Sequence, residues 1–297
     1  MSHDTLILGA SGFIGQRLAQ RLGASRALAT YHAHPAPGGV TFDALSDSLA
    51  TLGAPLTTAR HAFILFGITH IDVCAREPAR AAALNITATR SVIEQLVARG
   101  IVPVFASTDV VFDGARGGYR EEDAPRPILT YGRQKLEIEE FIREHAPRHL
   151  ILRLPKLIGD RPGDGGMLDD WLRAIDAGTP IVCATDQVFS PIALDDAVTA
   201  MIALIESGAT GTYHLGGPTA WNRADLFDAF AAALRKHRDV AARMRRCSIR
   251  DFPQFAEARP LDITMNSEKL YRATGFVPRD MTAVCAEFAA SAATRRK

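Results

Sequence analysis

The sequence predicts an α/β protein with a doubly wound parallel sheet and a smaller C-terminal domain. Three observations predict this class: short apolar segments typical of strands alternate with helical segments through the first half, no hairpin turns join the strands, and a glycine-rich turn follows the first strand. Parallel strands joined by helices form sheets that are covered on both faces. We therefore expect one domain over residues 1–155, to which later segments can return, and a second domain made mainly of residues 156–297.

The elements of the first half follow from apolar periodicity and from turn residues. Strands are expected at Thr5–Leu8, Ala27–Tyr31, Val40–Phe42, His61–Phe66, Ile101–Ser107 and His149–Leu154. Helices are expected at Phe13–Leu22, at Glu77–Arg99 with Gly100 as the C-cap, and at Tyr131–His145. After Leu154 the pattern changes to a glycine-rich segment, residues 159–166, and then to further helices and short strands. We expect this second half to supply specificity.

The composition of the 297 residues limits the classes of protein. With 47% hydrophobic and 23% charged residues, the chain has enough apolar side chains for a large core, which excludes disorder. Its 34 Lys and Arg against 33 Asp and Glu give a net charge of +1, so nucleic acid and membranes are not expected as partners. Widely spaced cysteines predict reduced thiols in the cytoplasm and no metal site: Cys74, Cys183, Cys247 and Cys285. No apolar stretch is long enough to cross a bilayer.

A basic run lies near the C-terminus, where we expect a helix and the loop after it. Its members are Arg235, Lys236, Arg238, Arg243, Arg245, Arg246 and Arg250. Charge runs of this kind usually form a solvated face, and recognition of a phosphate is the second interpretation.

The turn after the first strand reads Gly9-Ala10-Ser11-Gly12-Phe13-Ile14-Gly15, a GxxGxxG pattern between a strand and a helix. Glycines permit a tight turn and let the backbone approach a pyrophosphate, while the helix N-terminus offers N–H groups and a positive dipole end. We therefore expect a dinucleotide cofactor bound at Gly9, Gly12, Phe13, Ile14 and Gly15. Any turn from a strand to a helix can also be rich in glycine, so the pattern alone is a weak signal.

The end of the second strand bears on the choice of cofactor. NAD-specific sites usually carry an acidic residue there, and residues 29–34 contain none. Tyr31 and His32 are therefore expected to tolerate a 2′-phosphate, which Arg17 in the first helix can reach, so NADP(H) is preferred and NAD(H) is possible. The alternative is that the histidines are ordinary loop residues. Asp43 is a candidate partner for the adenine amine, or an N-cap for the next helix.

Tyr131 and Lys135 stand four residues apart on one predicted helix, so their side chains share a face. A nearby cation favours phenolate and lowers the pKa of a tyrosine, which makes the phenol a better proton shuttle at neutral pH. Lys135 can also bind the nicotinamide ribose. Thr108 ends the fifth strand, where ligands bind in open parallel sheets, and its hydroxyl can hold a carbonyl oxygen. The alternatives are a chance Tyr/Lys pair and a Thr108 that only caps the strand.

Together these segments resemble the extended short-chain dehydrogenase/reductase superfamily, and within it the family of dTDP-4-dehydrorhamnose reductase and its RmlD-like relatives. The resemblance covers nearly the whole chain. Its most specific part is the run Ser107-Thr108-Asp109-Val110-Val111-Phe112-Asp113-Gly114, followed by the pair Tyr131 and Lys135. The other segments that carry it are Gly9–Gly15, Ala75–Pro78 with Asn85, Tyr119, Glu121–Asp123, Pro127, Asp186–Gln187 with Ser190–Pro191, Gly211–Leu215 and Arg259–Leu261.

The resemblance implies a Rossmann-type N-terminal domain that binds NAD(P)(H) and a C-terminal domain for a nucleotide-linked sugar. It implies that Thr108 orients a keto oxygen, that Tyr131 is the general acid, and that Lys135 is its electrostatic partner. Asn85 either helps to orient the active site or packs within its helix.

The resemblance also implies substrate residues, with one departure from the family pattern. Gln187 and Arg259 are expected at the nucleotide part of the substrate, where a diphosphate needs such partners. Residues 154–159 read Leu-Pro-Lys-Leu-Ile-Gly in place of a Thr-Ser-Trp-Val-Tyr-Gly type segment, so the aromatic residue that contacts the sugar is missing. Lys156 in this segment is expected to favour a more polar or acidic ligand. The alternative is that Lys156 points to solvent.

The leading functional interpretation is an NADP(H)-dependent reductase of a nucleotide-linked keto sugar. The alternative from another class is a catalytically silent, cofactor-binding regulatory subunit like the beta subunit of methionine adenosyltransferase, and a nucleotide-sugar epimerase is the third. The presence of Thr108, Tyr131 and Lys135 favours catalysis. The sequence does not fix the oligomeric state, for which a homodimer is one possibility.

Overall fold

The computed structural model describes residues 3–241 and 243–294. The strands are, in chain order, β1 (Thr5–Leu8), β2 (Ala27–Tyr31), β3 (Val40–Thr41), β4 (His61–Ile64), β5 (Val102–Thr108), β6 (Leu150–Leu154), β7 (Leu157–Ile158), β8 (Ile181–Ala184), β9 (Val188–Phe189), β10 (Ile192–Ala193), β11 (Gly211–His214), β12 (Trp221–Asn222) and β13 (Met244–Cys247). The α-helices are α1 (Phe13–Leu22), α2 (Ile71–Arg76), α3 (Pro78–Ala82), α4 (Thr89–Val97), α5 (Thr130–His145), α6 (Met167–Asp176), α7 (Leu194–Glu206), α8 (Arg223–Arg235), α9 (Glu268–Thr274) and α10 (Met281–Thr294). Shorter helical turns are the 3₁₀ segments Leu49–Leu52, Ala54–Thr57, Asp109–Val111 and Ile249–Asp251 and the π-helical segment Ala83–Ala88. No helix in this part of the chain is long and apolar enough to span a membrane.

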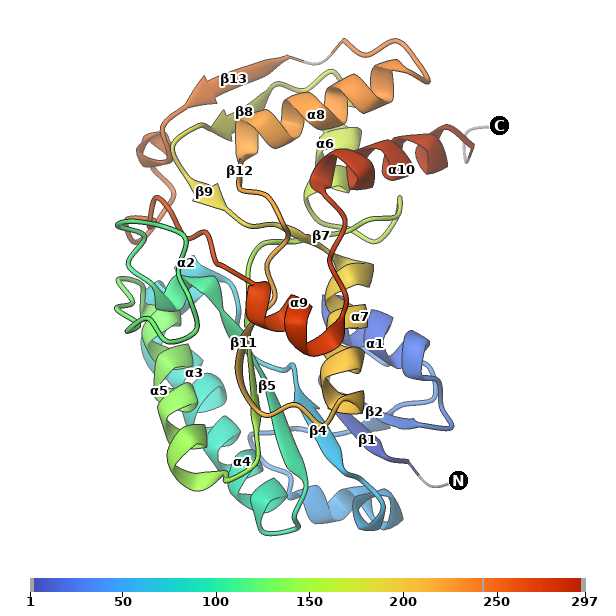
Figure 1. Ribbon diagram of the computed structural model, residues 1–297, viewed down its shortest axis with the longest axis vertical. Helices are drawn as coiled ribbons and strands as arrows, with labels where there is room; N and C mark the ends of the chain where they lie inside the picture. Colours follow the sequence, from blue (N-terminus) through green and yellow to red (C-terminus); the bar gives the residue numbers. More distant parts are fainter. Residues whose placement is uncertain (1–2, 242, 295–297) are drawn as a thin grey trace.

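Seven strands form one parallel sheet in the order β11-β6-β5-β4-β1-β2-β3 (Figure 1). β1 lies between β2 and β4, so the chain crosses from one half of the sheet to the other at this strand. Ligands in such sheets bind outside the carboxyl ends of the strands near the point where the strand order reverses. The predicted fold class, a doubly wound parallel sheet of the Rossmann type, is confirmed.

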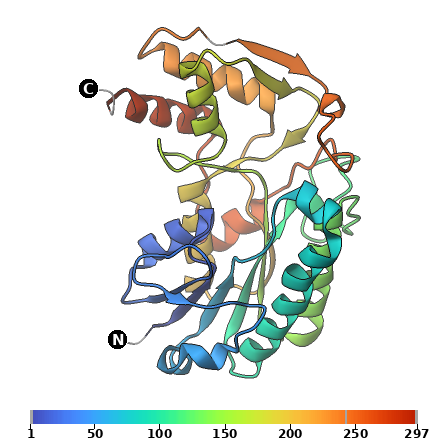
Figure 2. The ribbon, with the colours of Figure 1, turned by 180° about the vertical axis from the view of Figure 1, so that it is seen from behind.

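Helices cover both faces of the sheet (Figures 1 and 2). α1 and α7 pack together on one face, with α9 beside α7, while α4 and α5 pack on the other. Successive residues of a strand point to opposite faces, so β1 contributes to both layers. Ile7 lies in the core beneath α1 and α7, and Leu6 and Leu8 lie in the core beneath α4 and α5. All four residues of β1 are buried, which explains why Leu6, Ile7 and Leu8 are apolar without alternation.

A second, smaller layer lies at the other end of the molecule and contains α6, α8, α10 and the paired strands β8 and β13 (Figure 2). Aromatic rings fill its core: Trp171 meets Phe227 edge-on with centroids 5.3 Å apart, and Phe230 meets Phe288 at 5.6 Å. Not all of the second half belongs to this layer. β11 pairs with β6 in the large sheet, and α7 packs against α1.

The predicted elements agree with the structure best where the sheet is buried. β1, α1 and β2 have the predicted bounds, while the helix expected over Glu77–Arg99 is divided into α3, the π-helical turn and α4. The prediction for the basic run is wrong in one respect. α8 ends at Arg235, and residues 244–247, expected in a loop, form β13 because their backbone pairs with β8. Arg246 of this strand is solvent-exposed and forms an ion pair with Asp228.

Candidate active site

The glycine turn between β1 and α1 has the form that a dinucleotide site requires. Gly9 has a φ of +99°, and a Cβ there would lie 2.7 Å from the backbone nitrogen of Phe66. A Cβ at Gly15 would lie 2.4 Å from the carbonyl oxygen of Gly9, so packing requires both glycines. A Cβ at Gly12 would meet the same oxygen at 3.5 Å, an ordinary contact. The protein's own packing therefore does not require Gly12, which suits a position approached by a pyrophosphate.

The N-terminus of α1 offers N–H groups to an anion. Gly12 is the N-cap and provides no side-chain cap, and the first turn contains no acidic residue. Ile14 packs against the core of the sheet and thereby holds the helix start in place. Uncapped N–H groups and the positive end of the helix dipole together favour a phosphate.

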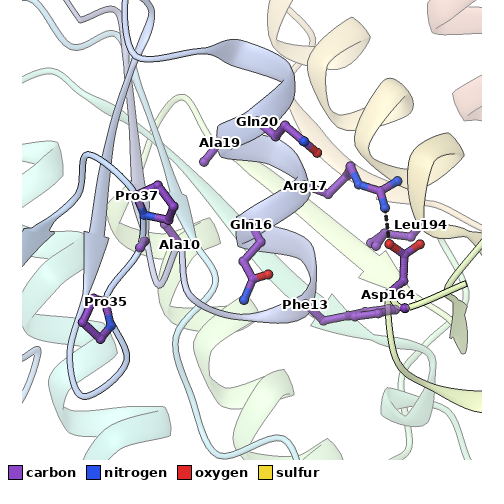
Figure 3. A pocket seen from close by; sticks show the side chains of 12 residues that line it. Ala10, Phe13, Gln16, Arg17, Ala19, Gln20, Pro35, Pro37, Asp164 and Leu194 are labelled. Carbon is purple, nitrogen blue, oxygen red and sulfur yellow. Dashed lines mark hydrogen bonds and ion pairs between the residues drawn. The ribbon is translucent and has the colours of Figure 1, made fainter. Parts of the chain in front are cut away.

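A cavity of about 800 Å³ opens beside this turn (Figure 3). Phe13 lines it, together with other residues of the first and second halves: Ala10, Gln16, Arg17, Ala19, Gln20, Pro35, Ala36, Pro37, Gly163, Asp164 and Leu194. The ring of Phe13 would lie 3.5 Å from a Cβ on Gly159 and 3.7 Å from one on Gly166. The glycine-rich segment after β7 thus packs against Phe13 and forms one wall of the cavity.

Arg17 is not free to bind a 2′-phosphate, so that prediction is wrong. Its guanidinium lies 2.6 Å from Asp164, 2.5 Å from Asp195 and 3.5 Å from Asp160 (Figure 3 shows the contact with Asp164). Burial opposes the charge of Arg17, but the hydrogen bonds to Asp195 and Asp164 and the charges of these two carboxylates outweigh it and raise the pKa of Arg17. All three carboxylates come from the second half of the chain, so Arg17 ties α1 to that half.

Tyr31, His32 and Asp43 lie at the carboxyl ends of β2 and β3. His32 is exposed, and its Nε2 lies 3.7 Å from a carboxylate oxygen of Asp43. The Asp43 side chain also accepts the N–H of Leu45 at 3.0 Å, so it caps the turn after β3. Among the described residues that line the 800 Å³ cavity, the loop after β2 contributes residues 35–37 and not these three.

Thr108, Tyr131 and Lys135 come together at the carboxyl end of β5. Thr108 is the last residue of β5, Tyr131 and Lys135 occupy successive turns of α5, and the three are 7%, 8% and 5% exposed. The Lys135 ammonium donates to the carbonyl oxygen of Ala106 at 2.8 Å and lies 5.7 Å from the centre of the Tyr131 ring. The predicted pair is therefore a packed unit that β5 holds in position.

The turn after β5 fits tightly against the start of α5. A Cβ on Gly132 would lie 2.2 Å from the carbonyl oxygen of Val110, so a glycine is needed for this approach. The Thr108 hydroxyl accepts the N–H of Val110 at 3.4 Å and donates to Asp109 at 3.1 Å. Thr108 therefore caps the 3₁₀ turn, as the alternative interpretation expected, and it also lines a cleft.

Burial dominates the protonation of these groups. It raises the pKa of Tyr131, and the charges of Cys74 and Asp109 act in the same direction. Burial also lowers the pKa of Lys135 to about 8 and raises that of Asp109 to about 7. The expectation that Lys135 lowers the pKa of Tyr131 is wrong, because burial of the phenol disfavours the charged phenolate and raises this pKa. Tyr131 is thus held protonated, which is the form that can donate a proton.

Asn85 braces the loop after β4 against α5. Its side-chain oxygen accepts the N–H of Ile68 at 2.8 Å, and its amide donates to the Ile68 carbonyl at 2.9 Å and to Gln134 at 2.8 Å. It is 4% exposed and lies in the π-helical turn. Of the two interpretations of Asn85, the contacts favour one that orients the elements around the site.

A buried ion network fixes α5 to the sheet behind the site. Arg153 of β6 donates to the Glu139 carboxylate at 2.8 and 3.0 Å, and the Ser107 hydroxyl donates to the same carboxylate at 2.5 Å. Arg153 also lies 3.2 Å from the Nε2 of His214 on β11, and burial lowers the pKa of His214 to about 3, so the imidazole is neutral. The network therefore sets the position of the helix that carries Tyr131.

The predicted substrate residues line one cleft of about 380 Å³ at this edge of the sheet. The predicted residues that line it are Thr108, Tyr131, Lys156, Gln187 and Arg259. The Arg259 guanidinium lies 2.6 Å from Asp72, and the Gln187 amide donates to the carbonyl oxygen of Pro260 at 3.0 Å. Lys156 is exposed at the cleft wall.

Four further ionisable residues line the cleft and were not predicted to act there: His70, Asp72, Asp109 and Arg223. Asp109 belongs to the family-specific run after β5, and no sequence motif contains Arg223. A signal for Arg223 exists in the sequence: it follows an Asn that caps α8, and a cation at a helix N-terminus is electrostatically unfavourable. Within residues 3–241 and 243–294, no group of three or more His, Cys, Asp or Glu is arranged to hold a metal ion.

Sequence comparison relates the chain to known reductases. A family model described as the RmlD substrate binding domain matches residues 3–293. The dTDP-4-dehydrorhamnose reductase of Sinorhizobium fredii is 29% identical over 226 residues, 71% of this chain and 73% of that protein. The probable low-salt glycan biosynthesis reductase Agl14 of Haloferax volcanii is 34% identical over 162 residues, and this match spans 53% of the chain and about half, 54%, of that relative. Methionine adenosyltransferase 2 subunit beta of Bos taurus is 38% identical over 89 residues, 30% of the chain and 27% of the subunit.

Solved structures share the whole fold. A hypothetical dTDP-4-dehydrorhamnose reductase from Sulfolobus tokodaii superposes with a TM-score of 0.80 at 25% identity, over 95% of this chain and 98% of that one. The dTDP-4-dehydrorhamnose reductase of Bacillus anthracis in complex with NADP gives a TM-score of 0.80 over 97% and 99%, and its 23% identity supports the fold alone. Because the family model covers nearly the whole sequence, the chain belongs to the RmlD substrate-binding domain family.

Proposed function

We propose that this protein is an NAD(P)H-dependent reductase of a nucleotide-linked keto sugar. The observation that carries the proposal is the single cleft that Thr108 and Tyr131 share with Lys156, Gln187 and Arg259. Lys135 packs beside the Tyr131 ring, and the glycine turn after β1 opens at the same edge of the sheet. Membership of the family and the reductases among its relatives support oxidoreductase chemistry.

When bound, the nicotinamide cofactor supplies a hydride to the keto carbon. The residues of this chain handle the oxygen and its proton. Thr108 orients the keto oxygen by exchanging its hydrogen bond with Asp109 for one with the substrate. Tyr131 donates its phenolic proton to that oxygen, and the Lys135 ammonium stabilises the phenolate that forms. The products are an alcohol and the oxidised cofactor, and a proton from solvent restores Tyr131.

The proposed cofactor site is the glycine turn, with Gly12 and the α1 N-terminus at the pyrophosphate and Phe13 at the cavity wall. A preference for NADPH over NADH is supported by the absence of Asp and Glu from residues 29–34. Calorimetric titration with both reduced cofactors tests this preference. Much tighter binding of NADH would contradict it.

Steady-state assays on a panel of nucleotide-linked keto sugars test the reductase itself. We expect turnover of at least one member, and a best substrate other than dTDP-4-dehydrorhamnose, because Lys156 stands where an aromatic sugar contact is expected in the family. The comparison uses the wild type and Lys156→Ala. A highest kcat/KM on dTDP-4-dehydrorhamnose that Lys156→Ala leaves unchanged would refute the specificity part of the proposal.

A regulatory, non-catalytic subunit is the second candidate function. The segment of 89 residues that is 38% identical to methionine adenosyltransferase 2 subunit beta favours it. Tight NADPH binding without turnover of any panel member would support this candidate over the reductase.

We also propose a cytoplasmic location, supported by the absence of disulfides among the described cysteines, and a homodimer is one assembly to test by light scattering.

A further inference from the structure

Two cations of the cleft, Lys156 and Arg223, come from segments far apart in the sequence. Lys156 lies two residues beyond Leu154, which pairs with Thr108 at the end of the sheet. Arg223 is the first residue of α8 and directly follows β12, whose Asn222 pairs antiparallel with Val188. Both residues line the cleft. They are close enough that the charge of Arg223 lowers the pKa of Lys156, in addition to the effect of burial.

Neither cation has an ion-pair partner among the residues that the structure describes, unlike the other arginine of the cleft. Arg259 is paired with Asp72 at 2.6 Å. The Nε–H of Arg223 is shielded from solvent and finds no acceptor in the described chain. Burial and the charge of Arg259 lower the pKa of Arg223, with Cys183 as the one opposing group. The Lys156 residue keeps exposed surface at the cleft wall, but desolvation of its ammonium and the charge of Arg223 lower its pKa more than the carboxylates of Asp109 and Asp170 raise it.

This arrangement costs stability in the free protein. A cation in the first turn of α8 faces the positive end of the helix dipole, and a shielded donor without an acceptor is unfavourable. Two like charges in one cleft add to the cost. An anionic group placed between Lys156 and Arg223 would offset the repulsion between the two cations and the unfavourable position of Arg223 at the start of α8, so the cleft suits an anion at this point.

A sugar nucleotide can carry an anion at its diphosphate or on its sugar ring, and the position of Lys156 and Arg223 in the cleft favours the sugar ring. Gln187 and the Asp72-paired Arg259 remain for the diphosphate. Lys156 is on the side of the cleft that carries Thr108, and its charge is coupled to Asp109, so it lies toward the reacting end of the sugar. A guanidinium and an ammonium together provide the donors for a carboxylate at that end.

We propose that Lys156 and Arg223 bind a carboxylate carried by the sugar ring, so that the substrate class is a nucleotide-linked keto sugar acid. This proposal rests on the proposed reductase function. It names a specificity-determining arginine, Arg223, and a chemical reason for the lysine that replaces an aromatic contact.

The test compares two substrates that differ only in the charge of the sugar: a nucleotide-linked keto uronate and the matching neutral keto hexose with the same nucleotide. Wild type is expected to show a kcat/KM at least tenfold higher on the acid. Arg223→Gln and Lys156→Met are each expected to lose on the order of 10- to 100-fold on the acid, the range for a hydrogen bond to a charged group. That loss should exceed the loss on the neutral sugar at least tenfold. Arg246→Gln removes one charge from an exposed ion pair outside the cleft and serves as the matched control.

The outcomes separate the two proposals. A wild type that prefers the neutral sugar overturns the carboxylate site and leaves the reductase standing. Equal losses on both substrates in Arg223→Gln and Lys156→Met place these cations at the diphosphate and also overturn it. If neither sugar is reduced, the reductase proposal fails. Calorimetric titration with both sugar nucleotides then tests the carboxylate site separately. Tighter binding of the uronate that both variants abolish supports the site, and equal binding overturns it.

Discussion

At the scale of a single residue, the surroundings of Tyr131 suit the phenol to donate a proton. Burial keeps its hydroxyl protonated. The Lys135 ammonium lies 5.7 Å from the centre of the ring, where it can stabilise the negative charge that remains after the proton leaves. Tyr131→Phe removes the proton and little else, because the ring continues to pack. We expect kcat to fall by on the order of 10² to 10⁴ while calorimetry shows unchanged cofactor affinity. Full turnover by Tyr131→Phe on a confirmed substrate would remove the assignment.

Lys135 predicts how activity depends on pH. Burial lowers its pKa to about 8, below its ordinary value, so the ammonium loses its proton as the pH rises through 8. Because the cation is needed to stabilise phenolate, kcat/KM should be full below that pH and decline above it. Asp109→Asn is the control, since it removes the nearby group whose pKa is about 7 and should leave the decline near pH 8 in place. A profile that stays flat to pH 10 would contradict this role of Lys135.

At the scale of an element, the glycine turn separates packing from ligand binding. Gly12→Ala adds a methyl group at an ordinary 3.5 Å contact, so the protein should keep its thermal midpoint and lose affinity for NADPH. Gly15→Ala forces a Cβ to 2.4 Å from a carbonyl oxygen and should destabilise the fold by about 1–3 kcal/mol. Thermal unfolding and cofactor titration of both variants measure the two effects. Equal destabilisation by the two substitutions would show that Gly12 also serves packing.

The local elements were the most predictable part of the structure. β1, α1 and β2 are fixed by short-range signals, namely an apolar run, a glycine turn and a helical period, and their bounds match the prediction. β13 could not be found in the same way, because its exposed, basic sequence becomes a strand only through pairing with β8. Site residues divide similarly. Thr108 and Tyr131 were found by motif and position, while the role of Arg223 depends on which charges fold around it.

Long-range charge pairing is what the sequence could not predict. Arg17 was expected at a phosphate, but three carboxylates from the second half surround it in the folded chain. The pKa of Tyr131 was expected to fall beside Lys135, and burial raises it instead. Both errors come from judging a charged or polar group by its neighbours in sequence, whereas desolvation and distant partners determine its state in the fold.

At the scale of the whole molecule, one buried network joins α5 with three strands of the sheet. Arg153→Met leaves the Glu139 carboxylate buried with only Arg143 and Ser107 as partners, so stability should fall by about 3–5 kcal/mol. Chemical denaturation measures the loss. Arg90 of α4 forms a half-exposed ion pair with Glu137, which lies on α5 like Glu139. Arg90→Met removes this pair and should lower the free energy of unfolding by at most about 1 kcal/mol. Equal effects of the two substitutions would mean that the network does not hold α5 to the sheet.

Isotope labelling of the transferred hydride tests the proposed reductase chemistry most directly. NADPH that carries deuterium at the transferred position of the nicotinamide is incubated with the protein and a nucleotide-linked keto sugar, and the product is examined by NMR and mass spectrometry. A reductase places one deuterium on the carbon that bore the keto oxygen and forms one equivalent of oxidised cofactor per product, and Tyr131→Phe is expected to lose both. Product without net cofactor oxidation would indicate an epimerase, and bound cofactor without product would contradict the assignment of a reductase.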